Sequence, residues 1–376
     1  MNRPYQVCTR CVMDTSASDI VFDAMGVCNY CSQFLIHSKD IIYQDPVAKK
    51  AELDRIVAQI KAAGKNKRYD CIVGVSGGVD SSWVLYQAVK LGLRPLAAHM
   101  DNGWNSELAQ HNIANLVQGL GVDLHTHVID WPEYKKLMQA FFDADVIDVE
   151  LLYDNAMLGV NYRLAVQHGT RYILAGTNQA TEGMRMPPGW NWFKYDKTNI
   201  KAVARNFGRV QMRTFPVIGT LDYVRYRVLN RIRWTSFLDM MPFNKFEALN
   251  ELTDRYGYKP YPYKHYESIF TRFYQGYILP NKFGIDKRRL HLGTLVAAGQ
   301  LSREKALEGL EGIAYASNAD LERDKQYFIK KMGWSSSDLS AYLSRDPKPH
   351  SLYGTEQPLW NMFQRSYATL CRGQAR

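Results

Sequence analysis

The chain has 376 residues, of which 46% are hydrophobic and 22% charged, proportions typical of an ordinary globular protein. This length is sufficient for two domains or for one large domain with additions. No apolar run is long enough to span a bilayer, and residues 1–11 lack the apolar core of a signal peptide. We therefore expect a cytoplasmic protein with no membrane contact.

The formal net charge of +10 favours acidic partners, either phosphorylated small molecules or nucleic acid. A mildly basic surface that binds no partner would have the same net charge. Because the basic residues are spread along the chain rather than gathered in blocks, nucleic-acid binding is not favoured.

Four of the six cysteines form two C-x-x-C pairs, Cys8 with Cys11 and Cys28 with Cys31. A redox pair or an iron–sulfur cluster also uses C-x-x-C, but two pairs at this spacing favour a structural zinc site. Residues 22–27 between the pairs predict a short hairpin that turns at Gly26. We expect residues 1–45 to form a zinc module, since so short a segment buries little core without a metal.

From residue 46 onward the hydrophobic pattern alternates between helix and strand. Continuous apolar runs are typical of parallel strands buried on both faces. The pattern predicts a doubly wound α/β domain over 46–220, followed by a mainly helical substrate or partner region over 221–376. We expect the tyrosine-rich stretch 256–266 to pack on the core as an extended segment, with binding of a nucleotide sugar or a partner protein as the alternative. Predicted strands are 71–75, 95–100, 124–129 and 172–175, and predicted helices are 47–64, 81–91, 106–120, 134–142 and 155–168.

The sequence SGGVDS follows the first predicted strand and opens the next helix. Gly77 and Gly78 allow a sharp turn and a close approach to a ligand, and the helix amides that follow favour an anion. No lysine stands where a Walker A loop has one. The loop therefore predicts a phosphate site, formed by Ser76, Gly77, Gly78, Val79, Asp80, Ser81 and Ser82.

This segment resembles the pyrophosphate loop (PP-loop) of the ATP pyrophosphatases. That superfamily includes GMP synthetase, NAD synthetase, asparagine and argininosuccinate synthetases and several tRNA-modifying enzymes. The resemblance implies an adenine nucleotide alpha-hydrolase-like fold, a loop that binds the β- and γ-phosphates of ATP, and transfer of AMP to a substrate oxygen. It also implies cofactor-binding residues at two further strand ends, namely His99, Asp101, Asn102, Gly176, Thr177 and Asn178, and magnesium ligands at Asp80 and Glu182. By residue type alone, His99 and Asp101 are more often structural.

The whole chain is similar to the N-acetyl sugar amidotransferases of bacterial surface-polysaccharide (LPS O-antigen) biosynthesis. Three segments carry this closer resemblance: CTRCVMDTS with GVCNYC near the start, GTNQATEGMRMPPGW at 176–190, and FGIDKRRLHLGTLVAAGQLSREKALEGL at 283–310. The resemblance implies that ATP adenylates the acetamido oxygen of a nucleotide-activated N-acetyl sugar. Ammonia then displaces AMP to give an acetamidino sugar. The sugar itself stays open between a UDP-linked diacetamido uronic acid and a nonulosonic acid or its precursor.

The same resemblance assigns further roles. Asp80, Lys287 and Arg288 are the catalytic candidates, although by residue type alone a solvated basic patch is the favoured account of Lys287 and Arg288. Substrate candidates are Arg185, Trp190, Lys194 and Arg289, and Trp192, Asn161 and Arg163 are additional candidates. Aromatic residues in loops are more often simply packed, so Trp190 and Trp192 keep that alternative.

The sequence contains no recognisable glutaminase, because neither Cys71 nor Cys371 lies in a nucleophile motif. We expect ammonia from a separate glutaminase subunit similar to that of histidine synthesis, with or without a cyclase-like barrel subunit. The expected cofactors are ATP, Mg²⁺ and structural Zn²⁺. The alternative is a PP-loop tRNA-modifying enzyme, but thiolation needs catalytic-domain cysteines and only Cys71 lies there.

Overall fold

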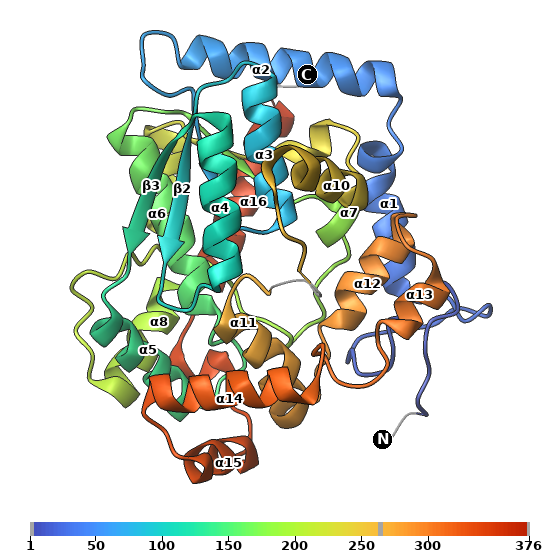
Figure 1. Ribbon diagram of the computed structural model, residues 1–376, viewed down its shortest axis with the longest axis vertical. Helices are drawn as coiled ribbons and strands as arrows, with labels where there is room; N and C mark the ends of the chain where they lie inside the picture. Colours follow the sequence, from blue (N-terminus) through green and yellow to red (C-terminus); the bar gives the residue numbers. More distant parts are fainter. Residues whose placement is uncertain (1–3, 262–265, 374–376) are drawn as a thin grey trace.

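The computed structural model describes residues 4–261 and 266–373. Within them, a five-stranded parallel sheet has the order β3-β2-β1-β4-β5 (Figure 1). The chain runs outward from β1 to β3 and then returns to β4 beside β1, so the strand order reverses there. Ligands bind at such a reversal, at the carboxyl ends of the strands. The strands are β1 (Cys71–Gly74), β2 (Pro95–Asp101), β3 (Asp123–Val128), β4 (Tyr172–Ala175) and β5 (Arg233–Ser236).

The central strand β1 shows why both faces of the sheet are covered. Side chains alternate along a strand, so Cys71 and Val73 belong to one hydrophobic cluster and Ile72 to the other. The predicted doubly wound fold is confirmed. The first cluster packs under α2 (Pro46–Ala63), α3 (Val79–Lys90), α4 (Glu107–Leu120) and α10 (Lys245–Tyr256); the second packs under α5 (Trp131–Asp143), α6 (Leu151–Gln167) and α8 (Lys197–Val203).

The predicted elements up to residue 175 are confirmed, with small shifts at their ends. Strand β5 was not predicted, because the four residues RWTS are short, mixed in polarity and lie at the sheet edge. Its presence extends the sheet beyond residue 220, the limit expected for the PP-loop domain.

The region after β5 is mainly helical, as predicted. The helices not yet named, which come both before and after β5 in the chain, surround the sheet or belong to the N-terminal module (Figure 1). They are α1 (Asn29–Ile42), α7 (Gln179–Glu182), α9 (Thr220–Val224), α11 (Ile269–Phe273), α12 (Arg288–Ala297), α13 (Arg303–Glu308), α14 (Asn318–Met332), α15 (Ser336–Ser344) and α16 (Gln357–Gly373), with short 3₁₀ or π segments at η1 (Ala204–Gly208), η2 (Arg225–Leu229), η3 (Phe237–Met240), η4 (Tyr274–Phe283) and η5 (His350–Tyr353).

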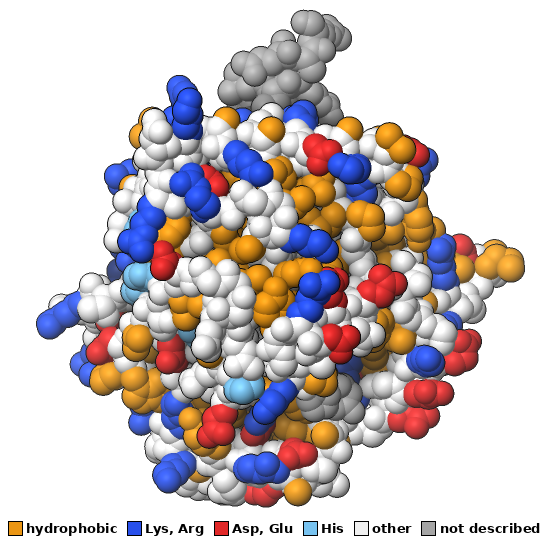
Figure 2. Space-filling view, turned by 45° about the horizontal axis from the view of Figure 1, so that its top comes forward, with side chains coloured by type: hydrophobic (Ala, Val, Ile, Leu, Met, Phe, Trp, Pro, Cys, Tyr) orange, Lys and Arg blue, Asp and Glu red, His pale blue; other side chains and the backbone are white. Residues whose placement is uncertain are grey.

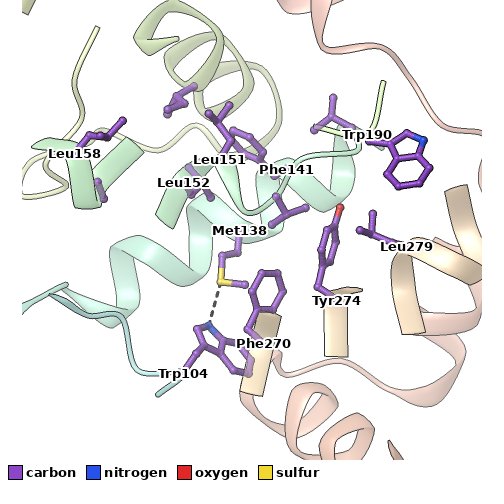
Figure 3. Close-up of a cluster of buried hydrophobic side chains, with 14 of the residues drawn as sticks. Trp104, Met138, Phe141, Leu151, Leu152, Leu158, Trp190, Phe270, Tyr274 and Leu279 are labelled. Atoms are coloured by element: carbon purple, nitrogen blue, oxygen red, sulfur yellow. Dashed lines mark hydrogen bonds between the residues drawn. The ribbon is translucent and has the colours of Figure 1, made fainter. Parts of the chain in front are cut away.

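The C-terminal helices share a core with the α/β part. In Figure 3, Phe270, Tyr274 and Leu279 face side chains of α5 and α6, and Trp104 donates its indole N–H to the Met138 sulfur at 3.3 Å. One continuous apolar cluster therefore fixes the C-terminal region against the sheet domain.

Candidate functional site

The SGGVDS loop joins β1 to α3 in the middle of the sheet. Gly77 has φ +88°, a conformation that favours glycine. The hydroxyls of Ser76 and Ser81 lie 3.2 Å apart, and Ser76 Oγ accepts from the Gly78 amide at 3.2 Å. Gly78 is the N-cap of α3 and has no side chain to cap it, so the first amides of a twelve-residue helix open toward the loop. This arrangement suits an anion.

Two tyrosines from the 256–266 stretch hold the loop. Tyr258 and Tyr261 both donate their hydroxyls to the Gly77 carbonyl, at 2.7 and 3.1 Å. Burial raises the pKa of both hydroxyls, which keeps them protonated as donors. The described part of the stretch packs on the core as predicted, whereas its residues 262–265 lie outside the described structure. Its contact with the loop was not predicted, since it depends on tertiary packing.

A cavity of about 600 Å³ opens at the carboxyl ends of β1, β2 and β4, a volume common for small-molecule sites. One wall is the PP-loop, and the opposite wall comes from η4, α12 and the segment after it. Residues at the cavity that bear on the chemistry are Ser76, Gly78, Val79, Asp80, Ser81, His99, Asn161, Gly176, Thr177, Thr181, Glu182, Glu267, Lys287, Arg288 and His291.

Three carboxylates line this cavity: Asp80, Glu182 and Glu267. Thr181 donates its hydroxyl to Asp80 Oδ2 at 2.8 Å, and Glu267 lies so close to Gly78 that a Cβ there would meet its carboxylate oxygen at 2.2 Å. Glu267 was not predicted, because nothing in its local sequence marks it. Among the described residues, the four cysteines are the only group of three or more His, Cys, Asp or Glu side chains close enough together to hold one metal ion, so the three carboxylates do not form such a group. Magnesium would therefore be held by one or two carboxylates together with phosphate oxygens, which is its common mode.

The segment Gly176-Thr177-Asn178 supports the loop from β4. A Cβ on Gly176 would lie 2.9 Å from the Ser81 amide nitrogen, so a glycine is needed for this close backbone contact. Asn178 caps α7 by accepting from the Thr181 amide at 2.9 Å. Gly176 and Thr177 line the cavity, whereas Asn178 positions Thr181.

The predicted residues after β2 separate into two groups. His99 lines the cavity, with Nδ1 3.0 Å from the Val75 carbonyl and Nε2 3.0 Å from Asn105 Nδ2. Asp101 and Asn102 instead accept from the amides of the turn that follows, at Gly103 and Trp104, and neither lines the cavity. Ser82 and Gly77 likewise lie outside the lining and belong to the framework of the loop.

Lys287 and Arg288 reach the cavity from the start of α12. Lys287 Nζ lies 2.9 Å from Glu150 Oε2, in a pair whose two side chains are each 10% exposed. Gln275 donates to both oxygens of Glu150 at 3.0 Å. Arg288 pairs with Asp286 and donates to the carbonyls of residues 309, 312 and 313. Both cations thus have protein partners at the wall of the cavity.

The four substrate candidates do not line this cavity. Arg185 pairs with Asp19 at 2.6 Å and Arg289 with Asp14 at 2.9 Å, both in the N-terminal module. Trp190 is buried in the shared core of Figure 3. Guanidinium groups pair with carboxylates as readily as with phosphates, so sequence alone could not separate these roles.

Lys194 and Trp192 line a second cavity of about 760 Å³. Lys194 Nζ lies 2.6 Å from Asp148 and 2.8 Å from Asp154. Burial alone would raise the pKa of Asp148, but Lys194 and Lys287 hold it below its usual value. Trp192 stacks on His350, and burial lowers the pKa of that histidine to about 4. A charge network therefore occupies this region.

The four cysteine sulfurs converge in the N-terminal module, all within 4.8 Å of one another. Cys8 and Cys31 sulfurs are 3.9 Å apart and those of Cys11 and Cys28 are 3.8 Å apart. Four sulfurs about 2.3 Å from a central zinc would be about 3.8 Å apart, so the set fits tetrahedral zinc. The predicted hairpin is confirmed, with Gly26 at φ +77°.

On the face in Figure 2, basic and acidic side chains are interspersed. Within the described chain, none of the helices has the length and apolar character needed to cross a membrane.

Two family models match this chain. One, described as NAD synthase, matches residues 52–190, and the other, described as the C-terminal domain of WbpG-like LPS biosynthesis proteins, matches residues 267–367. A search of curated proteins found no match.

Solved structures with partial likeness include NMN synthetase from Francisella tularensis, at 15% identity over 58% of this chain and 99% of that chain, with a TM-score of 0.29. A predicted subunit of tRNA methyltransferase from Methanocaldococcus jannaschii is 14% identical over 49% of this chain and 75% of that chain, with a TM-score of 0.28. NH3-dependent NAD synthetase from Campylobacter jejuni is 15% identical over 57% of this chain and 99% of that chain, with a TM-score of 0.27. Likenesses this low say nothing of what the chain acts on. By the two family matches, residues 52–190 form a domain similar to NAD synthase, of the PP-loop ATP pyrophosphatase type, and residues 267–367 form a domain similar to the C-terminal domain of WbpG-like LPS biosynthesis proteins.

Proposed function

We propose that the chain is an ATP-dependent amidotransferase acting on a nucleotide-activated N-acetyl sugar. It would convert the acetamido group to an acetamidino group and release AMP and pyrophosphate. The observation that supports this best is one cavity whose walls come from both matched segments, the PP-loop on one side and residues after 267 on the other. Such a cavity brings a nucleotide and a second substrate together, which favours their reaction by proximity. The two matches already support an ATP-using enzyme of the carbon–nitrogen ligase type.

The chemistry answers a specific difficulty: an amide oxygen is a very poor leaving group. In the proposed first step, the acetamido oxygen attacks the α-phosphorus of ATP, and the bond to the β-phosphate breaks. Pyrophosphate leaves with the electron pair. Ammonia then adds to the imidate carbon, the carbon–oxygen bond breaks, and AMP departs with the oxygen. One proton is released overall, and the product is an amidine.

Negative charge accumulates on the departing pyrophosphate. The open amides at the start of α3 and the hydroxyls of Ser76 and Ser81 would stabilise it. Lys287 and Arg288, which line the cavity and are paired with Glu150 and Asp286, would contribute positive charge from the opposite wall. Asp80 and Glu182 would hold magnesium, which when bound neutralises phosphate charge.

Water would hydrolyse the imidate, so the reaction needs a site that excludes it. The cavity is lined by apolar side chains of β2, α6 and α12, including Met100, Met157 and Leu295. Asn161 lies among them, 2% exposed, with an Oδ1 that has no hydrogen-bond partner among the described residues.

The nitrogen source is part of the proposal. Cys71 is buried in β1, and burial raises the pKa of its thiol, the opposite of an activated nucleophile. The side chain of Cys371 lies outside the described structure. We assign ammonia production to a separate glutaminase subunit similar to that of histidine synthesis, with or without a cyclase-like barrel. Equal rates with glutamine and with ammonium salt, using the purified chain alone, would contradict this assignment.

A product assay tests the function. The chain is incubated with ATP, magnesium, ammonium salt and a panel of nucleotide-activated N-acetyl sugars, and the products are identified by mass spectrometry. AMP, pyrophosphate and a sugar in which NH replaces oxygen would establish the activity and name the substrate. Ser76→Ala and Asp80→Ala serve as controls, with folding checked separately. AMP release only on adding bulk tRNA would favour the tRNA-modifying alternative, and ADP with phosphate would contradict the assignment of the loop.

A further inference from the structure

Helix α12 presents opposite faces to two different parts of the molecule. Lys287 before it and His291 and Leu295 within it line the cavity. Arg289 and Gly293, one turn apart on the other side, face the cysteine module. The helix thus forms a partition between the candidate ATP site and the four-cysteine module.

The contacts on the module side are specific. Arg289 pairs with Asp14, which is 3% exposed, and donates to the Val12 carbonyl at 2.9 Å. A Cβ on Gly293 would lie 3.5 Å from Met13 and 3.4 Å from Met184, so the helix packs tightly there. Breaking a largely buried ion pair leaves an uncompensated charge, which is strongly unfavourable.

Helix α13 makes a second contact with the first cysteine knuckle. Arg303 donates to the Cys8 carbonyl at 2.9 Å through Nη2 and to the Cys11 carbonyl at 3.1 Å through Nε. These two carbonyls belong to zinc-ligand candidates, so their positions depend on closure of the knuckle around the four sulfurs. The guanidinium therefore recognises the folded knuckle rather than any one side chain.

A third contact involves the wall formed by α7. Ser38 of α1 donates to Gln179 Oε1 at 2.9 Å, and Arg185 just after α7 pairs with Asp19 and donates to Gln33. Thr181 and Glu182, between these two contacts, line the cavity. Figure 1 shows α1 beside α7 and α12, with α13 next to α12.

We propose that the zinc-ordered module positions the α7 and α12 walls of the ATP cavity, with Arg289 and Arg303 as positioning residues. The inference rests on the proposed function for the identity of the ligand, but not for the mechanical coupling. Without the metal, a segment this small lacks the core to keep the Cys8 and Cys11 carbonyls in place. Loss of either arginine would then loosen α12 while leaving the sulfur cluster itself intact.

The test compares Arg303→Ala with Arg10→Ala, an exposed arginine between the same two cysteines. Zinc content, ATP affinity by calorimetry and amide hydrogen exchange are measured on the full chain. We expect both variants to retain zinc. Arg303→Ala should bind ATP about tenfold more weakly, equivalent to roughly one charge-assisted hydrogen bond, and should exchange faster in α12. Arg10→Ala should match wild type, and Arg303→Lys should restore part of the affinity.

Two outcomes are kept apart by this design. If wild type binds ATP and Arg303→Ala retains zinc with unchanged affinity and unchanged α12 exchange, the positioning role is overturned and the proposed function stands. If wild type binds no ATP, the proposed function fails, and the exchange data alone decide the coupling. Metal removal by a chelator should speed exchange in α7 and α12 but not in β2, and uniform exchange across all three would also overturn the inference.

Discussion

Thr181 donates its hydroxyl to Asp80 Oδ2 at 2.8 Å, and so joins α7, which follows β4, to helix α3 at the PP-loop. Asn178 orients Thr181 in turn, with its Oδ1 2.9 Å from the Thr181 amide and its Nδ2 3.0 Å from the Thr181 hydroxyl. The GTN segment therefore acts on the site through a hydrogen-bonded chain that fixes the carboxylate of Asp80.

Thr181→Val removes this donor at nearly constant volume. We expect kcat/KM for AMP formation to fall about ten- to a hundredfold, because a hydrogen bond to a charged group contributes about 1.5–3 kcal/mol. Thr181→Ser keeps the hydroxyl and should retain most activity. Steady-state kinetics with the substrate found in the product assay measures the difference. Equal activity of the Val and Ser variants would show that the Asp80 contact has no functional part.

Lys287 has both a structural partner and a proposed catalytic role, and a double variant separates them. Lys287→Met leaves Glu150 buried without its cation, so we expect a loss of about 3–5 kcal/mol in unfolding free energy together with loss of AMP formation. Adding Glu150→Gln removes the uncompensated charge and should restore most of the stability. Denaturant unfolding and activity are then compared. If the double variant also recovers AMP formation, Lys287 is structural only.

His350 predicts a pH dependence of stability. Its pKa is lowered from 6.5 to about 4 by burial, and it accepts from the Asp148 amide at 3.1 Å while neutral. Since the unfolded chain binds this proton more readily, the stabilisation is complete above pH 6.5 and is lost as pH falls toward 4, a loss of about 3 kcal/mol. Unfolding curves between pH 7.5 and 4.5 measure the slope. His350→Gln should flatten it, and an unchanged slope would assign the dependence to other groups.

The cysteine cluster predicts one bound zinc per chain. Cys28→Ser should lower zinc content and destabilise the N-terminal module, since each ligand supports the fold directly. Cys71→Ala is the matched control, because Cys71 is buried in β1 away from the cluster. Elemental analysis of the purified proteins gives the readout. Full zinc content in Cys28→Ser would refute the four-thiolate assignment.

Much of the α/β framework was predictable, because buried parallel strands, a glycine-rich loop and paired cysteines each leave a local sequence pattern. The short edge strand β5 leaves none, and neither does Glu267, which approaches the loop only in the folded chain. The roles of Arg185 and Arg289 were not predictable for another reason. A guanidinium suits a phosphate and a carboxylate equally, and only packing places Asp19 and Asp14 beside them.

The central claim is that the acetamido oxygen is transferred to AMP. A substrate labelled with oxygen-18 in the acetamido carbonyl, incubated with ATP, magnesium and ammonium salt, tests this most directly. The account predicts that each AMP formed with product carries one labelled oxygen in its phosphate, as read by mass spectrometry. Unlabelled AMP accompanying the amidine product would contradict adenylation of the acetamido oxygen.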